Sequence, residues 1–166
     1  MQSSYQQFIA FLVTGNFGPI QSSTSEAEIL TVIPTLSSYY DAPWSFLTEE
    51  DLEFTFDNHK LFMIRVKFDY PFSYQSWAEP LGIHWYTLVK EYTLHDLREL
   101  FHNAHIAYDI YYFDDDSTSL EPNNAPIAFV HREDQRIDSF RVFYTGRTKW
   151  NRNSTIIRKV ERFGSI

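Results

Sequence analysis

The 166 residues contain no cysteine, which removes several classes of chemistry at once. A chain without thiols has no disulfide, no Cys-ligated zinc or iron–sulfur cluster and no thiol nucleophile. The absence suits a reducing compartment, so the sequence predicts a cytoplasmic protein. Glycine is also scarce, at five residues, and none of them forms a phosphate-binding loop motif.

Long apolar segments are missing as well. The longest, from Phe8 to Val13, is too short for a signal-peptide core or a membrane span. No Lys or Arg precedes it, as a secretory signal would need. We therefore expect neither export nor membrane insertion.

Recognisable catalytic and metal-binding motifs are absent too. The six histidines include no His-Glu-x-x-His, and His95 and His102 are too far apart for a metal pair at helical i, i+4 spacing. The aspartate run 114–116 lacks the glycine and the terminal glutamate of a calcium loop. No serine nucleophile motif occurs. The sequence thus predicts no catalytic residue, no bound metal and no cofactor.

Aromatic residues and acidic charge are plentiful. Aromatic side chains make up 18% of the chain, which suits strands and one well-filled core, and the length fits a single domain over 1–166. Residues 1–146 carry 8 Lys and Arg against 21 Asp and Glu, whereas residues 147–166 carry 6 against 1. We expect an acidic body onto which a basic C-terminal segment folds back.

Capping signals and apolar spacing predict three helices. The first begins near the N-terminus and ends at Gly15. Two more begin with capping-box spacing, from Ser25 to Glu28 and from Thr93 to Asp96. Alternating or continuous apolar runs predict strands at 52–57, 62–68, 107–113, 127–131 and 137–144. The segment 154–163 fits either a short strand or an amphipathic helix.

The predicted elements repeat. A helix followed by a hairpin occupies approximately 22–70 and again 91–146, and the strand 64–68 corresponds to 140–144. We predict an α+β fold: a tandem helix-plus-β-hairpin repeat that forms an antiparallel sheet with the helices packed on one face.

Two acidic runs and the aromatic connector between the repeats are candidates for contact with a partner. Acidic loops attract a basic protein, and interfaces favour Trp and Tyr. The candidate partner-binding residues are Glu49, Glu50, Asp51, Trp77, Trp85, Tyr86, Asp114, Asp115 and Asp116. Solvated loops and core packing are the simpler explanations of the same residues.

The basic segment interleaves cations with an aromatic side chain around Trp150, as single-strand nucleic-acid platforms do. The acidic body opposes a polyanion, so nucleic acid is not the expected partner.

The segment from Phe11 to Ile20, FLVTGNFGPI, and the helix start Ser-Glu-Ala-Glu-Ile at 25–29 resemble immunity-type proteins of bacterial polymorphic toxin systems. In that family a Leu-Thr-Gly-x-Phe-Gly-Pro-Ile opening precedes a Ser-x-x-Glu-Val helix start, and the hairpin 52–68 also looks like theirs. The resemblance covers roughly residues 5–70. It departs from the family at 23–24, where a Gly-Met pair is usual, and at 33–35, where a Leu-Gly-x-Pro element is usual. What it implies is a toxin-neutralising role, with no catalytic residue.

The sequence therefore predicts an immunity-like binding protein, and no enzyme. It would mask a cytoplasmic, basic toxin domain by surface complementarity, with the cognate toxin as partner and no membrane contact. One alternative is a homo-oligomeric scaffold, such as a homodimer, built on the connector aromatics. Another is a small hydrolase-type enzyme that combines His84 or His131 with Asp109 or Asp138.

Overall fold

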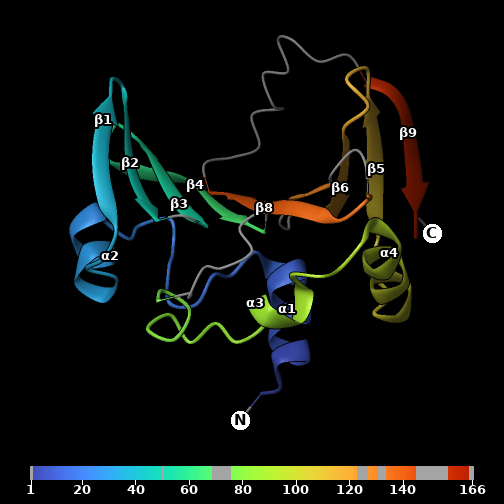
Figure 1. Cartoon of the computed structure of the whole chain (residues 1–166), viewed down its shortest axis with the longest axis horizontal. Coiled ribbons are helices and arrows are strands. Elements are labelled where there is room, and N and C mark those ends of the chain that lie inside the picture. Colours follow the sequence, from blue (N-terminus) through green and yellow to red (C-terminus); the bar gives the residue numbers. More distant parts are fainter. Residues whose placement is uncertain are drawn as a thin grey trace.

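The computed structural model describes residues 2–49, 51–68, 76–122, 127–130, 134–144 and 157–164. Along these ranges two helices are followed by four strands, and two further helices by five strands (Figure 1). The helices are α1 (Ser4–Thr14), α2 (Glu26–Val32), α3 (Tyr86–Val89) and α4 (Leu94–Asn103). The strands are β1 (Ser37–Asp41), β2 (Trp44–Glu49), β3 (Leu52–Asp57), β4 (Lys60–Lys67), β5 (Tyr108–Phe113), β6 (Thr118–Pro122), β7 (Ile127–Val130), β8 (Ile137–Phe143) and β9 (Ile157–Phe163).

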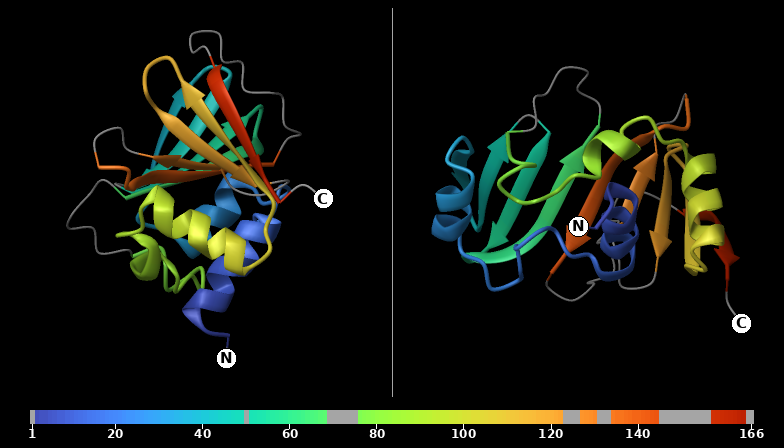
Figure 2. Two further views of the ribbon diagram at one scale, coloured as in Figure 1. Left: turned by 90° about the vertical axis from the view of Figure 1, so that its right-hand side faces the viewer. Right: turned by 90° about the horizontal axis from the view of Figure 1, so that it is seen from below.

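The nine described strands form one antiparallel sheet in the order β1-β2-β3-β4-β8-β7-β6-β5-β9. All four described helices lie on the same face of this sheet (Figure 2). The prediction of a mixed α+β fold with an antiparallel sheet and helices on one face is therefore confirmed. We call the opposite face, which no described helix covers, the helix-free face.

The two halves of the sheet have the same order of elements. In each, a helix precedes four consecutive strands, α2 with β1–β4 and α4 with β5–β8. The predicted bounds of approximately 22–70 and 91–146 enclose these elements, but a unit of one helix and one hairpin has fewer strands than each half contains. The halves meet where β4 pairs with β8, and Arg65 lies opposite Arg141 at this joint. The joint is flanked by backbone bonds from Phe68 N to Asp138 O and from Tyr144 N to Phe62 O, both 2.9 Å. That the two halves are copies of one sequence repeat stays a prediction.

The core lies between the sheet and the helices, and aromatic rings fill its centre beneath the joint. Phe8 and Phe11 of α1 each contact Phe140 of β8 with ring centroids 5.7 Å apart, and Phe11 stacks on Trp85 at 4.5 Å. All four side chains are at most 2% exposed. Burial of one such ring stabilises the fold by about 1.5–3 kcal/mol, so the packing of α1 contributes strongly to the stability of the centre of the sheet.

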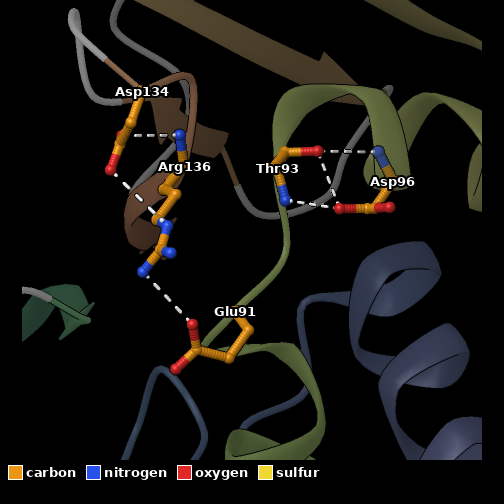
Figure 3. Close-up of polar contacts among 5 residues, drawn as sticks. All are labelled: Glu91, Thr93, Asp96, Asp134 and Arg136. Carbon is orange, nitrogen blue, oxygen red and sulfur yellow. Dashed lines mark hydrogen bonds and ion pairs between the residues drawn. The ribbon is translucent and has the colours of Figure 1, made fainter.

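The start of α4 is fixed to the start of β8 (Figure 3). Thr93 and Asp96 form the predicted capping box, and these hydrogen bonds from Thr93 lower the pKa of Asp96. Arg136 lies 3.2 Å from Glu91 and 3.5 Å from Asp134. Backbone hydrogen bonds from Leu94 N to Gln135 O at 2.8 Å and from Ile137 N to Tyr92 O at 3.0 Å join the start of α4 to the start of β8.

The basic C-terminal segment returns to the body of the molecule as far as the structure describes it. β9 pairs antiparallel with β5, which decides the open choice between strand and helix in favour of a strand. The part of the segment from 147 to 156 lies outside the described residues.

Candidate functional site at the β1 end of the sheet

The aromatic candidates do not lie on the surface. Trp77, Trp85 and Tyr86 are 0%, 2% and 3% exposed, so their prediction as partner contacts is wrong. A buried indole N–H needs an acceptor, and that of Trp77 donates to Asp51 Oδ1 at 2.8 Å. Asp51 is itself buried and is withdrawn as a partner contact for the same reason. The alternative of a homo-oligomeric scaffold needed exposed aromatic residues in the connector, and these three are buried.

The predicted acidic runs are not brought together. Glu49 ends β2 and accepts a hydrogen bond from Ser76 at 2.7 Å, and Glu50 lies outside the described residues. The run 114–116 is exposed in the turn between β5 and β6, where Asp116 pairs with Arg158. In the shared order of elements this turn corresponds to the β1–β2 turn, whereas Glu49 precedes the β2–β3 turn.

The histidine–carboxylate alternative gains no support from the geometry. His84 is exposed on the helix side, and its backbone N–H donates to Gln7 of α1 at 3.2 Å. No hydrogen bond or ion pair within the described ranges joins it to Asp109 or Asp138, and His131 lies outside those ranges. Within the same ranges no group of three His, Cys, Asp or Glu residues could hold a metal ion.

A surface that the sequence did not reveal lies on the helix-free face over β1, β2 and β3. Cross-strand neighbours point to the same face of a sheet. The strand register therefore places Asp41, Trp44 and Asp57 in one row, with Tyr39 and Phe46 in the next. The Tyr39 and Phe46 rings stack at 4.4 Å with 9° between their planes. We call the following residues the β1–β3 flank: Tyr39, Asp41, Trp44, Phe46, Glu53 and Asp57.

The β1–β3 flank is acidic. Within the ranges that the structure describes, no Lys, Arg or His nitrogen lies within ion-pair distance of Asp41, Glu53 or Asp57. The pKa of Tyr39 is raised, first by burial and then by the negative charges of Glu53 and Asp41. Carboxylates beside aromatic faces favour a guanidinium or an ammonium group, which gains both charge pairing and a cation–π contact.

The centre of the helix-free face is different, because its charges compensate one another. Arg65 and Arg141 lie opposite each other, an arrangement that like charges disfavour. Burial lowers the pKa of Arg141 to about 10, and the charge of Arg65 adds to the effect. Asp138 lies 3.8 Å from Arg65, and Glu53 is the cross-strand neighbour of Arg65. The arginine pair is therefore no ready site for a further charged group.

The β5–β9 end of the sheet is compensated as well. Arg162 of β9 lies 3.9 Å from Asp109 of β5, and Arg158 pairs with Asp116. Lys159 pairs with Glu161 within the strand. The basic strand thus neutralises acidic groups at its own end of the sheet, and the β1–β3 flank has no such strand among the described residues.

The sequence pattern predicted no strand before residue 52, so it did not indicate β1, β2 or the β1–β3 flank. The signal that was present is the density of aromatic residues on both sides of Pro43. None of the helices described here is long and apolar enough to cross a membrane. Comparison of the chain with known protein families, with characterised proteins and with solved structures found no match to any of them.

Proposed function

We propose that this protein is an immunity-like binding protein that masks a basic toxin domain in the cytoplasm. The observation that carries the proposal is a pair of carboxylates in the β1–β3 flank, Asp41 and Asp57, which have no cation within ion-pair distance among the described residues. Other carboxylates of the sheet, such as Asp109 and Asp138, already lie beside arginine. The flank is thus the surface on which a basic protein gains most from contact.

The chemistry of the flank matches that role. Opposite charge steers a basic partner toward the surface and raises its association rate. Trp44 and Tyr39 supply the kind of amphipathic aromatic contact that concentrates binding energy in protein interfaces. Masking needs no catalytic group, because a protein that covers the substrate site of a toxin blocks it by occupancy alone.

The test begins with capture of binding proteins from the native host. The bait is the whole chain, as wild type and as the variant Asp41→Asn/Asp57→Asn. The matched control is Asp114→Asn/Asp115→Asn, which removes the same charge from the β5–β6 turn. We expect one basic protein to be retained by the wild type and the control, to be lost from the flank variant and to be released by high salt.

The captured protein is then expressed with each variant, and growth of the cells is measured. We expect wild type and control to suppress its toxicity, and the flank variant to bind it at least about tenfold more weakly, since charge pairs at a desolvated interface contribute strongly. Equal binding by all three proteins, or a captured protein that is not toxic, would overturn the proposal.

A further inference from the structure

The first strands of the two halves occupy corresponding places. β1 follows α2 as β5 follows α4, and each carries two adjacent tyrosines, Tyr39-Tyr40 in β1 and Tyr111-Tyr112 in β5. The cross-strand partners correspond as well, because Tyr40 lies opposite Ser45 and Tyr112 opposite Thr118, two buried hydroxyl residues. Features of β5 can therefore be compared with β1 position by position.

The outer edges of these two strands differ. β5 pairs with β6 on one side and β9 on the other, whereas β1 pairs only with β2 among the described strands. All five residues of β1 are exposed. An edge strand presents unpaired N–H and C=O groups, and proteins usually protect it with Lys, Pro or a bulge. Ser37–Asp41 contains no Lys or Pro, its one charged residue is Asp41, and its register with β2 is regular.

β9 shows which chemistry suits such an edge. Opposite Tyr112, the Lys159 ammonium lies 5.5 Å from the centre of the tyrosine ring. The Tyr112 hydroxyl donates to Glu161 of β9 at 3.1 Å. At the corresponding place in the other half, Tyr40 is 69% exposed. A strand like β9 would cover Tyr40 as β9 covers Tyr112.

We propose that β1 accepts one more strand, an extended basic segment of the partner protein that resembles β9 in its content of Lys and Arg. The segment adds antiparallel to the outer edge of β1, where backbone hydrogen bonds supply affinity. Its cations meet Tyr40 on the helix side, while Asp41 and the β1–β3 flank lie on the other side. This inference rests on the proposed function and names the part of the partner that the flank receives.

A second copy of the chain is the less suitable occupant. The chain carries a net charge of −8, and pairing two β1 strands would bring together two surfaces of the same acidic sign. The helix next to β1 adds further carboxylates, among them Glu26 and Glu28. A basic segment meets no such repulsion.

The test uses a synthetic peptide with the β9 sequence, Ile-Arg-Lys-Val-Glu-Arg-Phe, titrated to millimolar concentration against the isotope-labelled full chain. We expect chemical-shift changes and slowed hydrogen exchange at the amides of Ser37–Asp41. The matched control peptide replaces the central valine, Val160→Pro, which keeps the charge and prevents strand pairing. No change at β1, changes confined to β5, or equal changes with both peptides would overturn the proposal. Concentration-dependent protection of β1 without peptide would overturn it in favour of self-association.

Two protein variants separate the edge from the flank. Hydrogen-bonding groups alternate along an edge strand, so one of Ser37→Pro and Ser38→Pro removes an outward N–H and the other disturbs pairing with β2. The variant that removes an outward N–H should keep the thermal stability of the wild type, and the variant that disturbs pairing with β2 should lose stability. We expect the variant of unchanged stability to bind the peptide at least about tenfold more weakly. If a basic partner is captured and depends on Asp41 and Asp57 but the peptide does not add to β1, the masking function stands and strand addition fails. If the peptide adds to β1 but no basic partner is captured, strand addition stands and the masking function fails.

Discussion

The two outer strands of the sheet, β1 and β9, differ in the residues that they place at an edge with unpaired backbone groups. At one end β9 presents Arg158, Lys159 and Arg162, and such charges discourage pairing with another chain. At the other end β1 has two serines, two tyrosines and one aspartate, and all are exposed. The difference teaches that exposure alone does not identify a binding edge. The feature that sets β1 apart is that it contains no Lys or Arg, whereas β9 contains three such residues.

The comparison also separates stability from recognition. β9 contributes to the fold through ring stacking and ion pairs, whereas all five residues of β1 are exposed. Substitutions at β9 should therefore change the free energy of unfolding, and substitutions at the surface of β1 should change binding. The following predictions run from the largest expected effect to the smallest.

The largest effect is expected from Phe163→Ala. Phe163 stacks on Tyr108 at 4.9 Å and lies under the Arg98 guanidinium at 5.0 Å, so its loss should unfasten β9 from β5 and α4. Because Phe163 is only half-buried, we expect the free energy of unfolding to fall by about 2 kcal/mol, less than for a fully buried ring. Urea unfolding measures the change.

The matched variant on the other edge is Tyr40→Ala, which should change the free energy of unfolding by no more than about 0.5 kcal/mol because Tyr40 is 69% exposed. Equal losses in the two variants would mean that the β1 edge is part of the stabilising structure. The contrast between the two edges would then disappear.

Local signals in the sequence were sufficient for much of the fold. The capping boxes at Ser25 and Thr93 and the hairpin of β3 and β4 depend on hydrogen bonds and alternation within a few residues, and the structure has all of them. β1 gave no such signal, because a strand exposed on both faces has no reason to alternate. β6 gave no strand signal either, because it is short and polar, although Ser119 is buried.

The candidate site could not be predicted in the same way. Aromatic residues on a core helix and aromatic residues on an open strand have the same composition, and only long-range packing tells them apart. Trp77 and Trp85 are buried by contacts with Phe17 and Phe11, which are distant in sequence. Trp44 stays on the helix-free face because of its register with Asp41 and β3. Charge behaves similarly, since the neutralisation of Asp109 depends on a strand that begins at 157.

A smaller effect is expected when β9 loses the two arginines that pair with the β5 end of the sheet. The variant Arg158→Gln/Arg162→Gln removes contacts with Asp116 and Asp109 that are largely exposed, so it should cost less than about 1 kcal/mol. The difference from wild type should shrink as NaCl screens these charges. Urea unfolding at low and high salt measures it. A loss that does not depend on salt would mean that the arginines stabilise β9 by packing of their apolar stems.

The smallest effect concerns pH, and it distinguishes the covered tyrosine from its neighbours. The pKa of Tyr112 is raised, first by burial and then by the hydrogen bond to Glu161 and the charge of that carboxylate. An unfolded tyrosine titrates near pH 10. Since the folded state holds the phenol proton more tightly, the stability linked to Tyr112 is fully present below about pH 10 and is lost as the pH rises through the higher folded value. Wild type should therefore lose stability more steeply than Tyr112→Phe above pH 10, as followed by urea unfolding from pH 8 to 11.

Tyr39→Phe is the matched control on the β1 side. Burial and the charges of Glu53 and Asp41 raise the pKa of Tyr39, but among the described residues no outer strand hydrogen-bonds its phenol. If the free energy of unfolding of wild type and of Tyr112→Phe depends on pH in the same way, the bond to Glu161 does not hold the proton of Tyr112. In that case β9 covers this tyrosine by packing alone.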